Sequence, residues 1–272
     1  MKLSSIKKGF KALGLVCRHP YLLNAVVNDE GVRHEEVVKR YGLQDGLPVV
    51  EIQKLFPDFS ERVSPYAYLS GATMPIDLAL LRMLARRQGV RDYFEIGTWR
   101  GESAANMAAV AEHCTTFNLP KEKIVELTHN ERYADLHGFF SQKLPNVTHL
   151  YGDSQTFDFT PYHQAFDMVF IDGDHHYEAV KRDTETAFQL LRDDHSVIVW
   201  HDYALDPETV RWNVLLAILD GAPADKRKNL YHVSNTLCAV YIPEDLPTGP
   251  LMPYEKPQKY FDVTIESHPC QS

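Results

Sequence analysis

The chain has 272 residues, of which 44% are hydrophobic and 24% charged, and its formal net charge at pH 7 is −9. This size and composition predict a folded globular protein, and the acidic balance argues against nucleic acid as a partner. The four cysteines lie far apart and form no CxxC pair. The sequence therefore suggests neither a zinc site nor a disulfide framework, and we expect a cytoplasmic protein.

Residues 1–70 are expected to form a helical leader, because helical periods alternate there with breaks such as "DGLP". The segment 1–23 predicts an amphipathic helix and lacks the cleavage site of a secretory signal. We expect this helix to pack on the domain behind it. The alternative is a weak surface contact with a membrane or a partner through Lys2, Lys7, Lys8 and Lys11. No window of the sequence approaches the roughly 18 apolar residues of a membrane span.

Residues 71–245 are predicted to form one α/β domain. A helix is expected over 75–88, with Pro75 near its start and Gly89 after its end. Short apolar runs and helical patterns then alternate, which predicts a mostly parallel sheet with helices on both faces. The last two runs, "LYHVS" and "LCAVYIP", are separated only by Asn235 and Thr236, so they should pair as an antiparallel hairpin. We therefore predict a Rossmann-like, seven-stranded sheet whose last strand is antiparallel, followed by a surface tail over 246–272.

The stretch "FEIGTWRGES" follows a predicted strand, where ligand sites of such sheets lie. In the dinucleotide pattern GxGxxG, the middle glycine lets the backbone approach a pyrophosphate. Here Trp99 stands at that middle position and Glu102 at the last one. The turn therefore predicts a ligand without a pyrophosphate.

The same turn fits a zwitterionic ligand. The backbone N–H groups of the helix that begins near Gly101 could bind a carboxylate, and Glu95 could accept hydrogen bonds from an ammonium group. A carboxylate, an ammonium group and a nucleoside together describe S-adenosylmethionine. The residues of this stretch that we expect to bind it are Glu95, Gly97, Thr98, Gly101 and Ser103.

Two later strand ends are expected to hold the nucleoside. Asn118 ends "CTTFN" about 20 residues on, where a side chain that binds the ribose hydroxyls usually lies. Thr128 would take this role if "KEKIVEL" were the second strand, but we favour a long helix over 121–144. Asp153 and Ser154 follow the third strand, where the adenine edge could be read.

Four stretches in this order, "YFEIGTWRGES", "YGDS", "FDMVFIDGDHHYEAV" and "VIVWHDY", resemble class I S-adenosylmethionine-dependent methyltransferases. Within that class, the chain is similar to the branch that contains the metal-dependent sugar O-methyltransferases of macrolide pathways. The resemblance spans roughly residues 75–243. It implies a methyl transfer from S-adenosylmethionine to a hydroxyl group.

Acidic and imidazole groups end two neighbouring strands. Asp172 ends "FDMVFID", and His201 and Asp202 end "SVIVWHD", so these side chains should converge and hold a divalent metal. Oxygen ligands favour Mg²⁺ or Mn²⁺, and His201 would favour a softer ion. The resemblance implies that Asp172 and Asp202 are metal ligands, with His201 where those enzymes have an acid. It also implies that His175 is the general base, so Asp172 and His175 are the predicted catalytic residues.

The prediction from the sequence is a metal-assisted methyltransferase that acts on a sugar, a glycan precursor or another small polar acceptor. One alternative is a nicotinamide-dependent oxidoreductase, and another is a non-catalytic adaptor that keeps the pocket. A homo-oligomer is compatible with the sequence.

Overall fold

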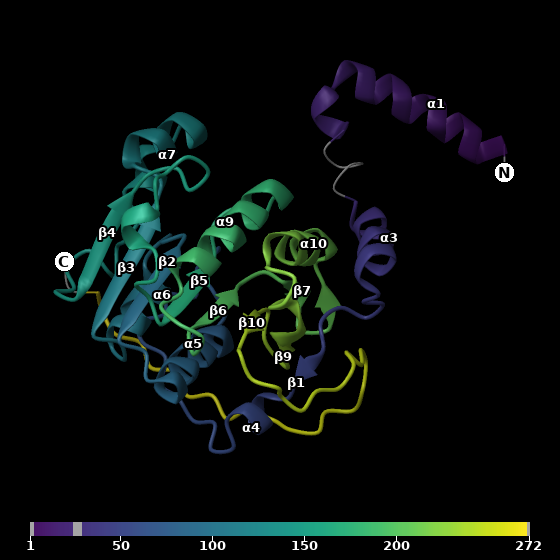
Figure 1. Cartoon of the computed structure of the whole chain (residues 1–272). Coiled ribbons are helices and arrows are strands. Elements are labelled where there is room, and N and C mark those ends of the chain that lie inside the picture. Colours follow the sequence, from purple (N-terminus) through teal and green to yellow (C-terminus); the bar gives the residue numbers. More distant parts are fainter. Residues whose placement is uncertain (1–2, 24–28, 271–272) are drawn as a thin grey trace.

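The computed structural model describes residues 3–23 and 29–270 (Figure 1). Its α-helices are α1 (Leu3–Arg18), α3 (Glu30–Tyr41), α4 (Ile52–Leu55), α5 (Pro75–Gln88), α6 (Glu102–Ala108), α7 (Lys121–Thr128), α8 (Glu131–Ala134), α9 (Tyr177–Leu190) and α10 (Trp212–Gly221). Three short 3₁₀ helices are η1 (Pro20–Leu22), η2 (Thr160–Tyr162) and η3 (Arg227–Asn229).

The strands are β1 (Val49–Val50), β2 (Asp92–Ile96), β3 (His113–Asn118), β4 (Val147–Tyr151), β5 (Met168–Ile171), β6 (Val197–Trp200), β7 (Ala204–Asp206), β8 (Thr209–Val210), β9 (Leu230–Val233) and β10 (Ala239–Tyr241). Eight of them form one sheet in the order β1-β9-β10-β6-β5-β2-β3-β4. Every neighbouring pair is parallel except the two made by β10, which is antiparallel to β6 and to β9. The predicted Rossmann-like sheet with an antiparallel last strand is therefore confirmed.

The eighth strand is the one that the sequence did not indicate. Val49 and Val50 lie in the leader and pair in parallel with His232 and Val233 of β9. A strand of two residues leaves no alternating pattern that could predict it. The leader thus contributes the edge of the main sheet.

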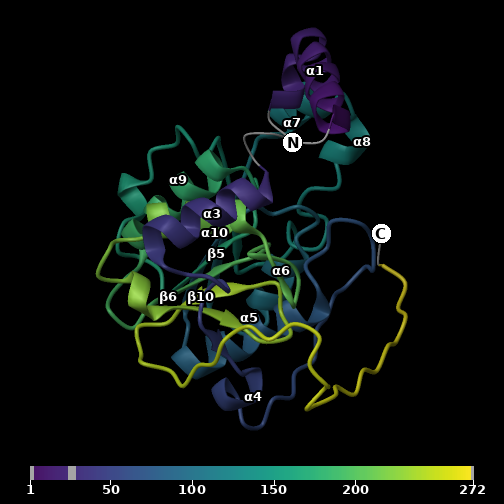
Figure 2. The same ribbon diagram turned by 90° about the vertical axis from the view of Figure 1, so that its right-hand side faces the viewer.

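Side chains alternate between two cores, one on each face of the sheet. On one face, Phe94, Val169 and Ile198 pack with buried residues of α3, α9 and α10. On the other face, Tyr93 and Phe170 pack with buried residues of α4, α5 and α6. Figures 1 and 2 show these two groups of helices on opposite sides of the strands. A sheet that is covered on both faces leaves its strand ends as the place for a site.

The order of the central strands places that site. Chain order runs outward from β2 to β3 and β4 on one side, and from β5 to β6 on the other. The reversal between β2 and β5 is a topological switch point, where ligands of doubly wound sheets bind beside the carboxyl ends of the strands. The turn after Ile96 and the turn after Ile171 both lie there.

Two features differ from the expectations. The segment 121–144 is not one long helix, because His129 adopts a left-handed φ of 52° and ends α7, and α8 is only one turn long. Residues 121–128 nevertheless form α7 and not the second strand that the alternative with Thr128 required. The strand that follows β2 is β3, which ends at Asn118. The helix α1 does not pack on the sheet domain but extends away from it (Figure 1). None of the described helices has the length and hydropathy of a membrane-spanning segment.

Candidate functional site at the switch point

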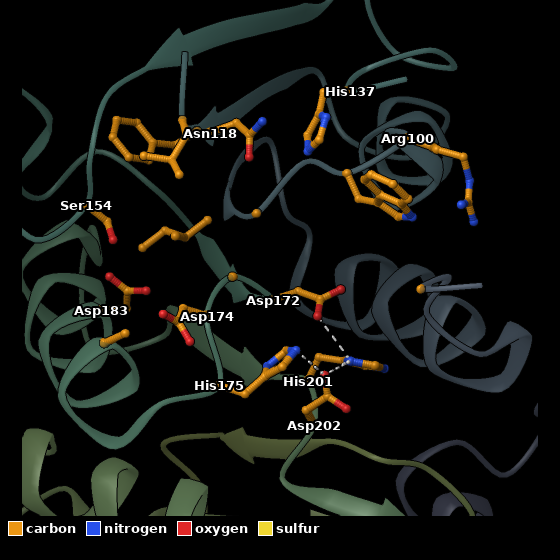
Figure 3. A pocket seen from close by; sticks show the side chains of 18 of the residues that line it. Arg100, Asn118, His137, Ser154, Asp172, Asp174, His175, Asp183, His201 and Asp202 are labelled. Atoms are coloured by element: carbon orange, nitrogen blue, oxygen red, sulfur yellow. Dashed lines mark ion pairs between the residues drawn. The ribbon is translucent and has the colours of Figure 1, made fainter. Parts of the chain in front are cut away.

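A cavity of about 950 Å³ opens at the carboxyl ends of the central strands. It runs from Asn118 and Ser154 at one end, past Gly97, to Asp172 and His201 at the other (Figure 3). A volume of this order matches the pockets that hold ligands the size of a small nucleoside derivative. The predicted turn, the nucleoside residues and the acidic residues thus meet in one space.

At Gly97, just after β2, the chain passes very close to the backbone of Asp172, just after β5. The φ of Gly97 is 102°, and a Cβ atom at this position would lie 2.0 Å from the carbonyl oxygen of Asp172. Only glycine fits both the backbone conformation and this approach. Trp99, two residues on, has a φ of 41° and lines the cavity, and its ring packs against the tilted ring of Tyr133 at a centroid distance of 4.5 Å. Trp99 therefore has a left-handed backbone conformation in the turn, and its indole forms part of the cavity wall.

Four of the predicted cofactor residues do not line the cavity. Glu95 and Ser103 are buried outside the cavity, and Thr98 is hydrogen-bonded to Thr116. Gly101 is the N-cap of α6, and a Cβ atom there would lie 2.2 Å from Oγ of Ser141, so this glycine serves packing.

Glu95 is fully buried below the cavity. Its carboxylate accepts hydrogen bonds from the hydroxyls of Tyr93 and Thr116, both at 2.8 Å. Burial raises the pKa of Glu95 to about 7, although these hydrogen bonds oppose the shift. Strand alternation explains its direction, because residue 95 shares a face with Tyr93 and not with Ile96.

Arg100 closes one wall. Its guanidinium donates to the backbone oxygens of Leu69 and Ser70 and lies 3.2 Å from the carboxylate of Glu102. It is 4% exposed. The arginine thus fixes the loop before α5 and its charge is already paired, so it neither reaches solvent nor is free for a cofactor carboxylate.

The nucleoside end of the cavity holds polar atoms without partners. Nδ2 of Asn118 is buried and makes no hydrogen bond, and the same is true of Oδ1 of Asp183 on α9. Both side chains line the cavity together with Asp153 and Ser154. Burial raises the pKa of Asp183 to about 7, against a hydrogen bond with Ser154. Buried polar atoms are rarely left unpaired, so donors and acceptors of a ligand fit here.

The acidic end brings together the three predicted metal residues. One oxygen each from Asp172 and Asp202 and one ring nitrogen of His201 lie within 4.8 Å of one another. Nδ1 of His201 is 3.1 Å from Asp172 and 3.2 Å from Asp202, yet it makes no hydrogen bond with either carboxylate (Figure 3). Two carboxylates around a nitrogen without a hydrogen bond fit a cation that all three groups would bind.

A fourth acid lies behind this cluster. Nε2 of His201 hydrogen-bonds to Oδ2 of Asp77 at 3.1 Å, and Asp77 is fully buried on α5. The other oxygen of Asp77 accepts from the backbone N–H of Leu237 at 3.0 Å. This arrangement places the proton of a neutral His201 on Nε2 and leaves the lone pair of Nδ1 toward Asp172 and Asp202.

The charges of the cluster shift the pKa values of His201 and Asp202. Burial disfavours the charged form of His201, but Asp172, Asp202 and Asp77 outweigh burial and raise the imidazole pKa well above its ordinary value. Burial likewise opposes the charge of Asp202, but His201 outweighs it and lowers the carboxyl pKa to about 2. Without another cation, the imidazole itself neutralises the acids.

His175 lies at the mouth of the cavity. Its Nε2 is 3.1 Å from Oδ2 of Asp202, and nearly half of its side chain is exposed. Its neighbours Asp174 and His176 instead hydrogen-bond to each other, and His176 leads into α9. His175 is therefore the histidine of this loop that faces the acidic cluster.

Two site residues were missed from the sequence. Asp77 lies in line with Leu80, Leu81 and Leu84 on the buried face of α5. Asp183 lies on the buried face of α9, although the "KRDTE" stretch around it reads as a solvated charged stripe. An acid at an apolar position of an amphipathic helix is the signal that could have identified both.

A family model described as a methyltransferase domain matches residues 94–203. No curated protein matches the chain.

Several solved structures are similar. The O-methyltransferase TomG of Streptomyces achromogenes, in complex with S-adenosylmethionine, is 19% identical, with 63% of this chain and 81% of that chain covered and a TM-score of 0.41. An O-methyltransferase of Bacillus cereus in complex with S-adenosylhomocysteine is 17% identical, with 83% and 97% covered and a TM-score of 0.43. CalS11, a TDP-rhamnose 3′-O-methyltransferase of calicheamicin biosynthesis, is 16% identical, with 61% and 79% covered and a TM-score of 0.40.

The matched segment 94–203 contains the glycine turn, both nucleoside strand ends and the acidic cluster. A model of the methyltransferase domain thus matches this segment, and the chain resembles the class I S-adenosylmethionine-dependent methyltransferases.

Proposed function

We propose that this protein is a metal-assisted O-methyltransferase that transfers the methyl group of S-adenosylmethionine to a hydroxyl of a sugar or another small polar acceptor. The observation that carries the proposal is the convergence of Asp172, His201 and Asp202 beside the switch-point cavity, with His175 at its mouth. The sheet domain of residues 71–245 would carry the chemistry, with the leader of 1–70 and the tail of 246–272 around it.

The cofactor would lie across the switch point. Asn118 would donate to a ribose hydroxyl, and Asp153, Ser154 and Asp183 would surround the adenine, where Oδ1 of Asp183 can accept from its amino group. Gly97 lets the chain pass without a side chain between the nucleoside and Asp172. The expected ammonium contact of Glu95 is replaced in this proposal by groups that line the cavity, because Glu95 is buried below it.

Asp172, Asp202 and Nδ1 of His201 would hold a divalent metal. Two carboxylates and one imidazole suit Mn²⁺ or a softer first-row ion better than Mg²⁺. When bound, such an ion polarises an alcohol oxygen and makes its proton easier to remove. Asp77 would fix the His201 ring and its tautomer.

His175 would accept the proton of the acceptor hydroxyl. As the alcohol oxygen forms a bond to the methyl carbon, the bond from that carbon to sulfur breaks and S-adenosylhomocysteine leaves. Asp202, 3.1 Å from His175, would stabilise the imidazolium that forms. The protein contributes mainly alignment of the oxygen, the methyl group and the sulfur.

Binding and turnover test the two parts separately. Calorimetry should show S-adenosylmethionine binding to the wild type, and Mn²⁺ titration by electron paramagnetic resonance should show one bound ion. Methyl transfer from labelled cofactor would be measured on a panel of nucleotide sugars and catechols. His175→Ala should lose turnover while it keeps both binding reactions, and His176→Ala is its matched control. A wild type that binds neither cofactor nor metal would refute the proposal.

A further inference from the structure

The charge of the chain is divided unevenly between its N-terminal segment and the rest. Residues 1–28 carry five Lys or Arg and no Asp or Glu, whereas the remaining 23 basic and 37 acidic residues give residues 29–272 a formal charge of −14. The basic residues of the described part of this segment are Lys7, Lys8, Lys11 and Arg18. A charge difference of this size indicates an anionic partner for the segment.

These cations sit on a helix with an exposed apolar stripe. Phe10, Leu13 and Cys17 recur at helical spacing in α1, and Phe10 and Leu13 are 73% and 61% exposed. Lys7 and Lys11 are exposed on the flank of this stripe, four residues apart. A helix with an apolar stripe and a purely basic flank is typical of segments that lie in the headgroup region of a membrane.

The rest of the described chain does not cover this helix. No ion pair among the described residues involves Lys7, Lys8, Lys11 or Arg18, although the body is strongly acidic. Figure 1 shows α1 standing apart from the sheet domain. The stripe therefore has no partner within the described part of the chain.

The part of the sheet domain around α7 and α8 also exposes large apolar side chains. Figure 1 shows α7 and α1 on opposite sides of the molecule, although they overlap in the projection of Figure 2. Leu127 of α7 is 61% exposed, and Leu136 and Phe139, just after α8, are 40% and 52% exposed. Leu136 also lines the cavity.

We propose that α1 binds the surface of an anionic phospholipid bilayer, with Phe10 and Leu13 inserted between the headgroups and the lysines against the lipid phosphates. An anionic bilayer can bind both parts of the helix, because its acyl chains contact the apolar stripe and its phosphates attract the basic flank. The inference does not depend on the proposed methyl transfer.

Sedimentation with vesicles tests the proposal on the full chain. At low salt, the protein should sediment with vesicles of phosphatidylcholine and phosphatidylglycerol, should stay in solution with pure phosphatidylcholine, and should be released by 1 M NaCl. In the triple variant Lys7→Glu, Lys8→Glu, Lys11→Glu, the partition coefficient onto these vesicles should fall by at least about 100-fold. The variant Phe10→Glu, Leu13→Glu should lose at least about tenfold.

Matched controls separate these effects from general charge and hydrophobicity. Lys39, Lys54 and Lys256 are exposed on the body, and their change to Glu alters the net charge equally but should change partitioning little. Met252 and Tyr254 are exposed in the tail, and their change to Glu is the apolar control. Because α1 stands apart, its variants should keep the circular dichroism and the thermal midpoint of the wild type.

Three results would overturn the inference: no sedimentation of the wild type, equal binding to neutral vesicles, or equal loss in the control variants. A molar mass in solution that falls from dimer to monomer in Phe10→Glu, Leu13→Glu would assign the stripe to a second copy of the chain instead. Cofactor calorimetry on the same samples reports on the proposed function separately, so failure of one proposal is distinguishable from failure of the other.

Discussion

The two ends of the cavity leave their buried polar groups in different states. At the nucleoside end, Asn118 and Asp183 each keep one buried atom without a hydrogen bond. At the acidic end, Asp172, Asp202 and Asp77 already surround His201, and the imidazole holds a raised pKa because of them. The first end needs hydrogen-bonding partners, whereas the second needs positive charge. The difference supports our proposal that a neutral nucleoside would bind at one end of the cavity and a cation at the other.

The largest expected effect falls on the residue between the two ends. Gly97→Ala should lower the free energy of unfolding by about 4 kcal/mol, because the added methyl group meets the Asp172 carbonyl and φ is positive. Urea unfolding would measure it. Gly89→Ala is the matched control, since its φ is 65° but no atom lies within 4 Å of the new Cβ, and it should cost about 1 kcal/mol. Equal costs at the two positions would show that the close approach of the strand ends does not exist.

The second prediction removes charge from the acidic end. The double variant Asp172→Asn, Asp202→Asn should weaken Mn²⁺ binding by at least roughly 100-fold, because amide oxygens carry no charge to attract the ion. Cofactor affinity should change far less. Asp174→Asn is the control, because Asp174 lines the same cavity but belongs to the neighbouring loop. Paramagnetic titration would measure the metal and calorimetry the cofactor, and parallel losses of both would contradict two separate ends.

The third prediction concerns the acid behind the histidine. Asp77→Asn should weaken metal binding by about 10–100-fold. The amide N–H₂ can face Nε2 of His201 and then favours the tautomer with a proton on Nδ1, where the ion would bind. If His201 served only to neutralise the acids and did not bind the ion, Asp77→Asn would leave the metal affinity unchanged. The thermal midpoint measured beside the titration separates this loss from a loss of folding.

The smallest effect is expected at the nucleoside end. Asn118→Leu keeps the size of the side chain but removes the donor, so S-adenosylhomocysteine affinity should fall by about 2- to 10-fold, the usual value of one hydrogen bond. Metal binding should stay as in the wild type. Calorimetry with the two ligands in turn would measure both, and a loss of metal with an unchanged cofactor would reverse the assignment of the two ends.

The sequence by itself determined the parts of this protein whose signals are local. Alternating apolar runs predict β2 to β6 and the final hairpin, and glycine spacing identifies the turn at Gly97. Strand ends rich in Asp and His predict that Asp172, His201 and Asp202 meet, since neighbouring parallel strands end at one edge.

Tertiary structure alone decided what depends on contacts between distant segments. It buried Glu95 below the cavity instead of in it, bound Arg100 to the backbone of the loop before α5, and joined two leader residues to β9. It also brought Asp77 to His201 across 124 positions of the chain. The direction of a side chain and the identity of its partner follow from packing between elements, and no local period in the sequence encodes that packing.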